Sequence, residues 1–191
     1  GNNKVHLVTA DGGFDFSTNY NHQEQMSMRL LVCEIVGAIS CLEIGGHFVL
    51  KIFDIYTHFS VNIIYFLTHI FGNIFLVKPF TSRPANSEKY IICKNFKGID
   101  KKYLDKIFDI ISEWEILDSQ NKYVNNIFNV KVPLEFEHSL KGYNYYLCKI
   151  QIKNILKTLS YIDLSLENTH INFIKQNQAI VTSYWCQKYD I

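Results

Sequence analysis

The first half of the chain alternates short apolar runs with amphipathic stretches. Residues 5–10 are mostly apolar and rich in β-branched side chains, and the run stops at residues 11–13, which predicts a buried strand followed by a loop. Asp11 then stands at the carboxyl end of a strand. Ligands bind at that edge in open α/β sheets, so Asp11 is a candidate site residue.

A helix is predicted after this strand. Asn21 and Glu24 have the spacing of a helix N-cap and its reciprocal partner, so we expect the helix to begin near His22. Apolar residues recur at helical spacing as far as Leu42. The glycine pair Gly45-Gly46 then predicts a left-handed stop.

The chain next returns to strands. A nearly continuous apolar run at 47–53 predicts a second strand, interrupted near its end by Lys51. The pattern continues with a helix at about 58–71, a strand at 74–77, a polar loop at 79–87 and a strand at 90–93 that Glu88 opens. No helical pattern separates the last two strands, so we expect them to be antiparallel neighbours.

The residues beyond Phe96 have a different character, with longer polar and aromatic segments. They predict helices at about 101–115, 144–160 and 169–188, with a break at residues 132–134. We therefore divide the chain into an α/β part, residues 1–96, and a mainly helical extension, residues 97–191.

Composition and charge narrow the class of protein. The 191 residues are 48% hydrophobic and 15% aromatic, which suits a packed α/β domain. A formal net charge of +1 means that any surface for nucleic acid must be local. The cysteines form no CxxC pair and the histidines no HxxxH pair, so we predict no metal site and a reducing compartment. The apolar run at 61–77 is too short and too interrupted for a membrane span, so we expect no membrane partner.

Three ionisable residues stand where α/β enzymes often hold catalytic groups. Asp11 follows the first strand, Lys51 ends the second and Glu88 opens the fourth. If the fourth strand runs antiparallel, its start lies at the same sheet edge as the ends of the parallel strands, and the three side chains could converge. The plainer alternative is that Asp11 caps a helix and Lys51 extends to solvent.

Several motifs together resemble one family. They are residues 9–14 (TADGGF), 21–24, 45–54 (GGHFVLKIFD) and 78–90 (KPFTSRPANSEKY). This series is similar to that of the FtsJ-like RNA ribose 2′-O-methyltransferases, and the strings ADGG and TSRPANSE resemble the eukaryotic and viral cap-1 mRNA enzymes most. Residues 132–135 and 151–153 also resemble the helical region after that family's catalytic domain. The resemblance implies an α/β fold: the C-terminal half of a Rossmann-like, S-adenosylmethionine-dependent methyltransferase sheet with a mainly helical C-terminal extension.

The resemblance also implies a catalytic set. A Lys-Asp-Lys-Glu tetrad surrounds the target ribose in that family, and Asp11, Lys51 and Glu88 match its last three members. Lys51 is expected to act as the base or to steer the lone pair of the 2′-hydroxyl, with its amine held by the two acids. Asp11 and Gly12 are expected to contact the methyl donor, S-adenosylmethionine. The first lysine and most donor-binding segments are expected upstream of Gly1, so this chain alone should bind the donor poorly.

For the RNA substrate, the resemblance and the residue chemistry favour Asn21, Ser82, Arg83 and Asn86, since a polar loop with one guanidinium suits phosphate and ribose contacts. Two of these residues have structural alternatives. Asn21 would also serve as a helix cap, and we favour this interpretation. Asn86 would also shape its own loop.

The function implied by the resemblance is methyl transfer to a ribose 2′-hydroxyl near the 5′ cap of mRNA. It implies a nuclear location, or a cytoplasmic one for a viral protein. Two alternatives stay open: a methyltransferase of ribosomal or transfer RNA, and a non-catalytic RNA-binding or interaction fragment. The expected partners are the capped 5′ end of mRNA and either an N-terminal segment or a second copy that covers exposed strand edges.

Overall fold

The computed structural model describes residues 4–16, 20–119, 124–128, 130–163 and 168–191. Its elements follow the order β1 (Val5–Ala10), the 3₁₀ turn η1 (Tyr20–His22), α1 (Gln23–Cys41), β2 (Leu42–Ile52), α2 (His58–Ile70), β3 (Phe71–Val77), β4 (Lys89–Phe96), α3 (Lys101–Ser119), α4 (Leu134–Asp163) and α5 (Asn168–Tyr189). Helices α1 and α2 alternate with the strands of a mixed sheet, and α3, α4 and α5 follow, which confirms the predicted α/β class.

The sheet combines parallel and antiparallel pairs in the order β1-β2-β4-β3. β1 pairs with β2 in parallel, whereas β4 is antiparallel to both β2 and β3. The predicted antiparallel arrangement of the last two strands is therefore confirmed. The start of β4 consequently lies beside the ends of β1 and β2, and the register places Lys51 opposite Tyr90.

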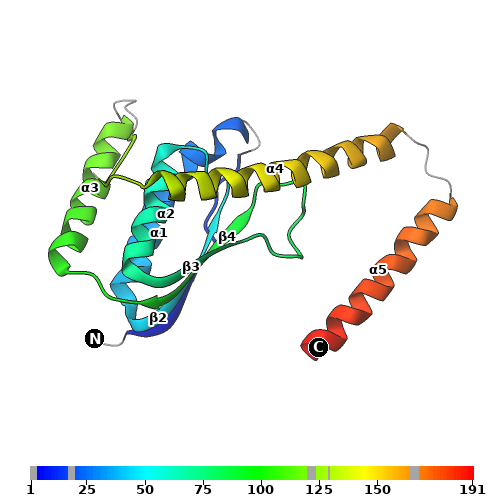
Figure 1. Cartoon of the computed structure of the whole chain (residues 1–191), viewed down its shortest axis with the longest axis horizontal. Helices are drawn as coiled ribbons and strands as arrows, with labels where there is room; N and C mark the ends of the chain where they lie inside the picture. Colours follow the sequence, from blue (N-terminus) through cyan, green and yellow to red (C-terminus); the bar gives the residue numbers. More distant parts are fainter. Residues whose placement is uncertain (1–3, 17–19, 120–123, 129, 164–167) are drawn as a thin grey trace.

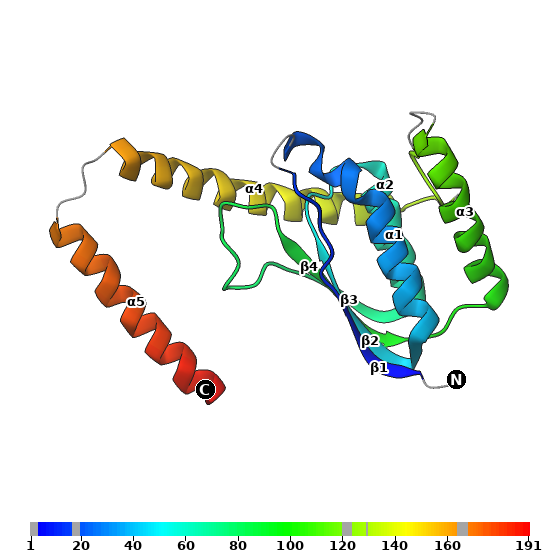
Figure 2. The ribbon, with the colours of Figure 1, turned by 180° about the vertical axis from the view of Figure 1, so that it is seen from behind.

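One face of the sheet carries the core. Phe48, Leu50 and Ile52 of β2 are buried, and the residues between them are less so, which is the two-residue period of a strand. α1 and α2 lie side by side over that buried face (Figures 1 and 2). Lys51 is out of phase with the buried residues, so it belongs to the opposite, more open side of β2.

Both ends of α1 differ from the prediction. The N-cap is His22, with no side-chain cap hydrogen bond, and Asn21 lies in η1, so the predicted capping role of Asn21 is wrong. At the other end the chain becomes extended at Leu42, immediately after Cys41. Gly45 does have a positive φ of 87°, but it lies inside β2 instead of stopping the helix.

The glycine pair serves a bulge in β2. The pairing with β1 is Val5 with Leu42 and then Leu7 with His47, so β2 carries extra residues between those two pairs. A Cβ on Gly46 would approach the carbonyl oxygen of Glu43 to 2.9 Å. The regular strand therefore starts at His47, which is where the sequence pattern predicts it.

The helical part packs partly on the same core. Ile107 and Trp114 of α3 and Leu140 of α4 are buried in it, and the Trp114 ring meets Phe59 edge-on at 5.6 Å. α4 starts at Leu134, directly after Pro133, instead of at about residue 144. The division of the chain at residue 96 stays a prediction.

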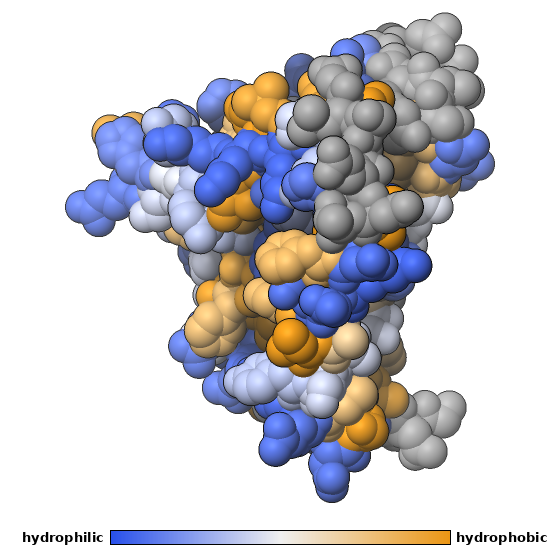
Figure 3. All heavy atoms as spheres, turned by 90° about the vertical axis from the view of Figure 1, so that its right-hand side faces the viewer, coloured by the Kyte–Doolittle hydropathy of each residue, from blue (hydrophilic) through white to orange (hydrophobic). Residues whose placement is uncertain are grey.

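α5 stands away from the sheet (Figure 1), and almost all its described side chains are exposed. Apolar side chains such as Phe173 and Ile180 are among them, and the view from that side shows apolar and polar side chains mixed (Figure 3). Within the described ranges, no helix is both long enough and apolar enough to cross a membrane.

Candidate functional site

The ends of β1 and β2 bring Asp11 and Lys51 together. The Nζ of Lys51 lies 2.9 Å from Oδ1 of Asp11 and donates a second hydrogen bond of 2.9 Å to the backbone oxygen of Asp11. The Lys51 side chain is 16% exposed and that of Asp11 is 72% exposed. An ammonium carries three N–H groups, so one of them remains for a ligand at this rim.

Glu88 lies at the same rim, two residue positions further along. Lys51 pairs with Tyr90, and Glu88 precedes Tyr90 by two residues, so an extended backbone turns both side chains to the same side. The Tyr90 hydroxyl donates to Oε1 of Glu88 over 3.4 Å. Burial, followed by the charges of Glu88 and Asp11, raises the pKa of Tyr90. Glu88 is thus linked to the rim through Tyr90; among the described residues no ion pair joins it to Lys51 directly.

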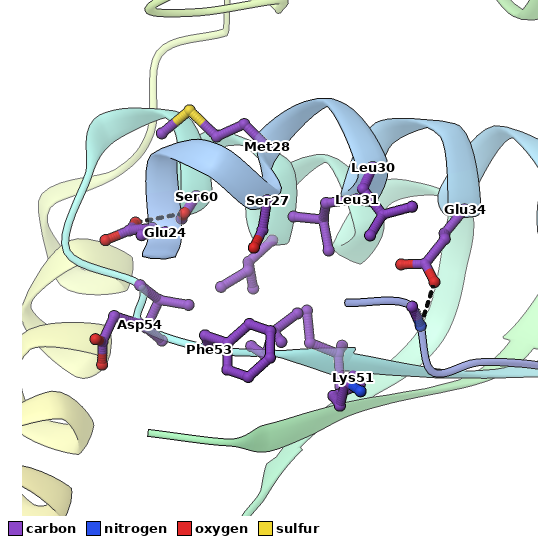
Figure 4. Close-up of a pocket in the computed structure, with 15 residues that line it drawn as sticks. Glu24, Ser27, Met28, Leu30, Leu31, Glu34, Lys51, Phe53, Asp54 and Ser60 are labelled. Atoms are coloured by element: carbon purple, nitrogen blue, oxygen red, sulfur yellow. Dashed lines mark hydrogen bonds between the residues drawn. The ribbon is translucent and has the colours of Figure 1, made fainter. Parts of the chain in front are cut away.

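Glu34 is a further carboxylate at the rim that the sequence prediction missed. Its Oε1 accepts a 2.8 Å hydrogen bond from the amide of Gly12, and Figure 4 shows this bond joining α1 to the turn after β1. Burial raises the pKa of Glu34, while the Gly12 amide and the charge of Lys51 partly oppose that shift. A charged residue within the apolar stretch 30–39 was the available signal.

Gly12 has a structural reason that involves no ligand. A Cβ at this position would lie 2.5 Å from Oε1 of Glu34, so only glycine fits the turn without displacing the carboxylate. Its amide is already engaged by Glu34. Contact between Gly12 and the methyl donor stays a prediction.

The polar loop between β3 and β4 folds around Lys78, another residue that the prediction missed. The Nζ of Lys78 donates to Oγ of Ser82 at 3.1 Å and to both Oδ1 and the backbone oxygen of Asn86 at 2.9 and 3.0 Å. It also donates to the backbone oxygen of Glu88 at 2.7 Å. The Arg83 side chain is exposed. Asn86 therefore does shape its loop, and the RNA contacts of Ser82, Arg83 and Asn86 stay predictions.

The first turn of α1 connects this loop to α2. Oε1 of Gln23 accepts from the Ser87 hydroxyl over 3.1 Å. The adjacent Glu24 accepts from the amides of Tyr56 and Thr57 and from the hydroxyls of Thr57 and Ser60, the last of which is drawn in Figure 4. Asn21 is exposed beside this junction, and its contact with RNA stays a prediction.

Behind the loop lies a buried amine. Lys89 is 3% exposed, donates to the backbone oxygen of Phe53 at 2.5 Å and lies 3.8 Å from Oδ1 of Asp54. Burial lowers the pKa of Lys89 to about 8, against the opposing charge of Asp54. Helix α4 contacts the loop beside it, where Gln151 donates to the backbone oxygen of Ala85 at 3.1 Å. In the part of the chain that the structure describes, no cluster of three or more His, Cys, Asp or Glu residues could hold a metal ion.

The comparisons with known proteins decide the family. Residues 2–96 match the sequence model of the FtsJ-like methyltransferase family. The chain belongs to the FtsJ-like methyltransferases through this segment. The segment contains β1 to β4 and every site residue described above except Gln151.

The curated relatives extend the likeness beyond the sheet. Proteins named cap-specific mRNA (nucleoside-2′-O-)-methyltransferase 1 are 40% identical over 161 residues in Mus musculus and 39% identical over 166 residues in Homo sapiens, and each match covers 83% of this chain. The enzyme named 1A from Caenorhabditis briggsae is 46% identical over 107 residues, which is 54% of this chain and 12% of that protein. The chain spans about a fifth of the two mammalian proteins, 19% in each case.

A solved structure described as a ribosomal RNA methyltransferase from Plasmodium falciparum is also similar. Its TM-score is 0.38 at 22% identity, over 50% of this chain and 49% of that one. A likeness at this level does not decide anything about substrate.

An FtsJ-like family implies S-adenosylmethionine as methyl donor, and the site fits part of such a molecule. Asp11 presents an exposed carboxylate that can accept hydrogen bonds from a ligand. The Gly12 amide already donates its hydrogen bond to Glu34, so it offers no free N–H to the donor. Contact of Asp11 with the donor stays a prediction, as it does for Gly12.

Proposed function

We propose that this chain forms part of an enzyme that methylates the ribose 2′-hydroxyl near the 5′ cap of mRNA. The observation that carries the proposal is the convergence of Asp11 and Lys51 at one rim, with Glu88 beside them, in a chain whose curated relatives are named as cap-specific enzymes. Capped mRNA as substrate and a nuclear location are parts of the same proposal.

The residues of the rim suit the chemistry of a ribose hydroxyl. Bound S-adenosylmethionine supplies an electrophilic methyl group, and the chain's own task is to align the weakly nucleophilic 2′-oxygen with it. Asp11 takes two N–H groups of Lys51 and so fixes the amine in place. The third N–H can be donated to the 2′-oxygen and steer its lone pair; a neutral Lys51 would instead accept the hydroxyl proton.

Replacement of Lys51 tests the proposal in the longer protein that contains this chain. We expect Lys51→Met to lower kcat for methyl transfer to a capped RNA about 10²- to 10⁴-fold, the usual contribution of a positioned proton-transfer group. Lys106→Met removes an exposed charge from α3 and should leave kcat within about twofold. Turnover by Lys51→Met close to that of the unaltered protein would refute the assignment.

Two further measurements separate the alternatives. Lys51→Arg keeps a donor but cannot accept a proton, so activity in this variant supports the steering role over the base role. Equal rates on capped and uncapped RNA of one sequence would favour an enzyme for ribosomal or transfer RNA. Donor and RNA binding without methyl transfer in the unaltered longer protein would favour a non-catalytic fragment.

A further inference from the structure

Lys78 directly follows the end of β3, whereas Lys51 lies next to the last residue of β2. The Lys78 side chain faces its own loop instead of a neighbouring strand. Its ammonium has four oxygen atoms within hydrogen-bonding distance, all contributed by residues 82, 86 and 88. An ammonium has only three N–H groups, so these oxygens saturate it. Lys78 is consequently not free to bind a phosphate itself.

We infer that Lys78 is a positioning residue, which holds the loop between β3 and β4 in the shape that presents its RNA contacts and Glu88. The inference rests on the proposed function and deepens it. Two of the four acceptors are backbone oxygens, those of Asn86 and Glu88, so the cation fixes the course of the chain and not only its side chains.

The loop is also held from its other side. Ser87 lies between the two residues whose carbonyls face Lys78, and its hydroxyl donates to Gln23 of α1. Backbone bonds from the amide of Ser82 to Pro79 and from the amide of Asn86 to Arg83 form two turns within the loop. These bonds leave the guanidinium of Arg83 exposed at the tip, where it can reach a phosphate.

The surroundings of the Lys78 ammonium explain why a lysine suits position 78. The Lys78 side chain is half-buried, and burial lowers its pKa, while the nearby charge of Glu88 opposes that shift. A methionine has similar length but would leave all four oxygens without this donor. An arginine keeps the charge, but its planar fork cannot converge on four oxygens around one point.

The test compares Lys78→Met with Lys106→Met, a loss of the same charge from an exposed site. In the present chain we expect hydrogen exchange at the amides of Ser82 and Asn86 to accelerate about tenfold or more in Lys78→Met only. In the longer protein we expect KM for capped RNA to rise by about tenfold or more, while the affinity for S-adenosylmethionine stays unchanged. A general loss of folding would instead weaken the binding of both capped RNA and S-adenosylmethionine.

Unchanged exchange and unchanged KM in Lys78→Met would overturn the inference. If Lys78→Met does not fold, Lys78→Arg is measured in its place, and an unaltered KM and loop exchange there would overturn it equally. Absence of methyl transfer by the unaltered longer protein would count against the proposed function alone, because the exchange measurement still tests the role of Lys78 without any activity.

Discussion

Lys89 is a buried charged residue whose burial the sequence does not predict. Lys89 follows Glu88 directly and precedes the predicted start of a strand, so it reads as an ordinary surface residue. In the structure Lys89 is the first residue of β4 and points to the buried side of the sheet. There it donates to the backbone oxygen of Phe53 and pairs with the Asp54 carboxylate. Phe53 and Asp54 lie in a loop far from Lys89 in the sequence, so no local sequence pattern predicts these contacts.

The buried amine of Lys89 should make stability depend on pH. The pKa of Lys89 falls from the ordinary 10.5 to about 8 on folding, so between these values the unfolded chain binds more protons and stability rises with pH. We expect the unfolding free energy of the unaltered chain, minus that of Lys89→Met, to increase by about 2 kcal/mol from about pH 7.5 to about pH 9.5.

Urea unfolding at the two pH values measures this difference. Taking the difference between the two proteins removes the contributions of the tyrosines whose pKa values are raised by burial, because both proteins share them. Lys106→Met, from an exposed position, should show no such dependence. A difference that stays flat or falls with rising pH would contradict the assignment.

At the scale of elements, the first turn of α1 shows why a correct local pattern can have a wrong partner. The spacing of Asn21 and Glu24 suggested a reciprocal cap within one helix. The structure directs the Glu24 carboxylate to the start of α2, where two amides and two hydroxyls donate to it. Four tertiary donors outweigh one local amide, and Thr57 caps α2 through its own side chain.

Loss of this carboxylate should loosen α1 from α2. We expect Glu24→Ala to lower the unfolding free energy by about 1–3 kcal/mol, since part-buried donors lose their acceptor. Glu115→Ala breaks the exposed pair with Arg29 at 3.2 Å and should change stability by less than about 0.5 kcal/mol. Urea denaturation of both variants provides the measurement, and equal effects would argue against the junction.

At the scale of the whole molecule, the sheet was more predictable than the site. Apolar runs and the missing helix between the last two strands predicted the antiparallel direction of the fourth strand, and with that direction Asp11, Lys51 and Glu88 belong to one edge of the sheet. Glu34 escaped prediction because its partner is the backbone amide of Gly12, 22 positions away in the chain. Lys78 escaped because two of its four acceptors are the backbone oxygens of Asn86 and Glu88, which any residue would supply. The early start of α4 escaped because its first turns mix acidic and apolar residues and gain order from packing, as the buried Leu140 indicates.

The outlying position of α5 leads to a prediction about the size of the cooperative unit. Its described side chains are nearly all exposed, so a chain that ends at residue 163 should keep its unfolding free energy within about 1 kcal/mol of the full chain. Urea unfolding followed by circular dichroism tests this. A chain that ends before Leu134 would also lose the buried Leu140 and should unfold more easily.

The register between β2 and β4 gives the loop that joins β3 to β4 a meaning of its own. Side chains alternate along a strand, so a slip of β4 by one residue would place Lys89 opposite Lys51 and send Glu88 beneath the sheet. A change in the length of this loop that shifts the register would therefore remove Glu88 from the rim without altering any residue of the rim. Sequence comparisons that count only the identity of the acids and the amine would overlook such damage.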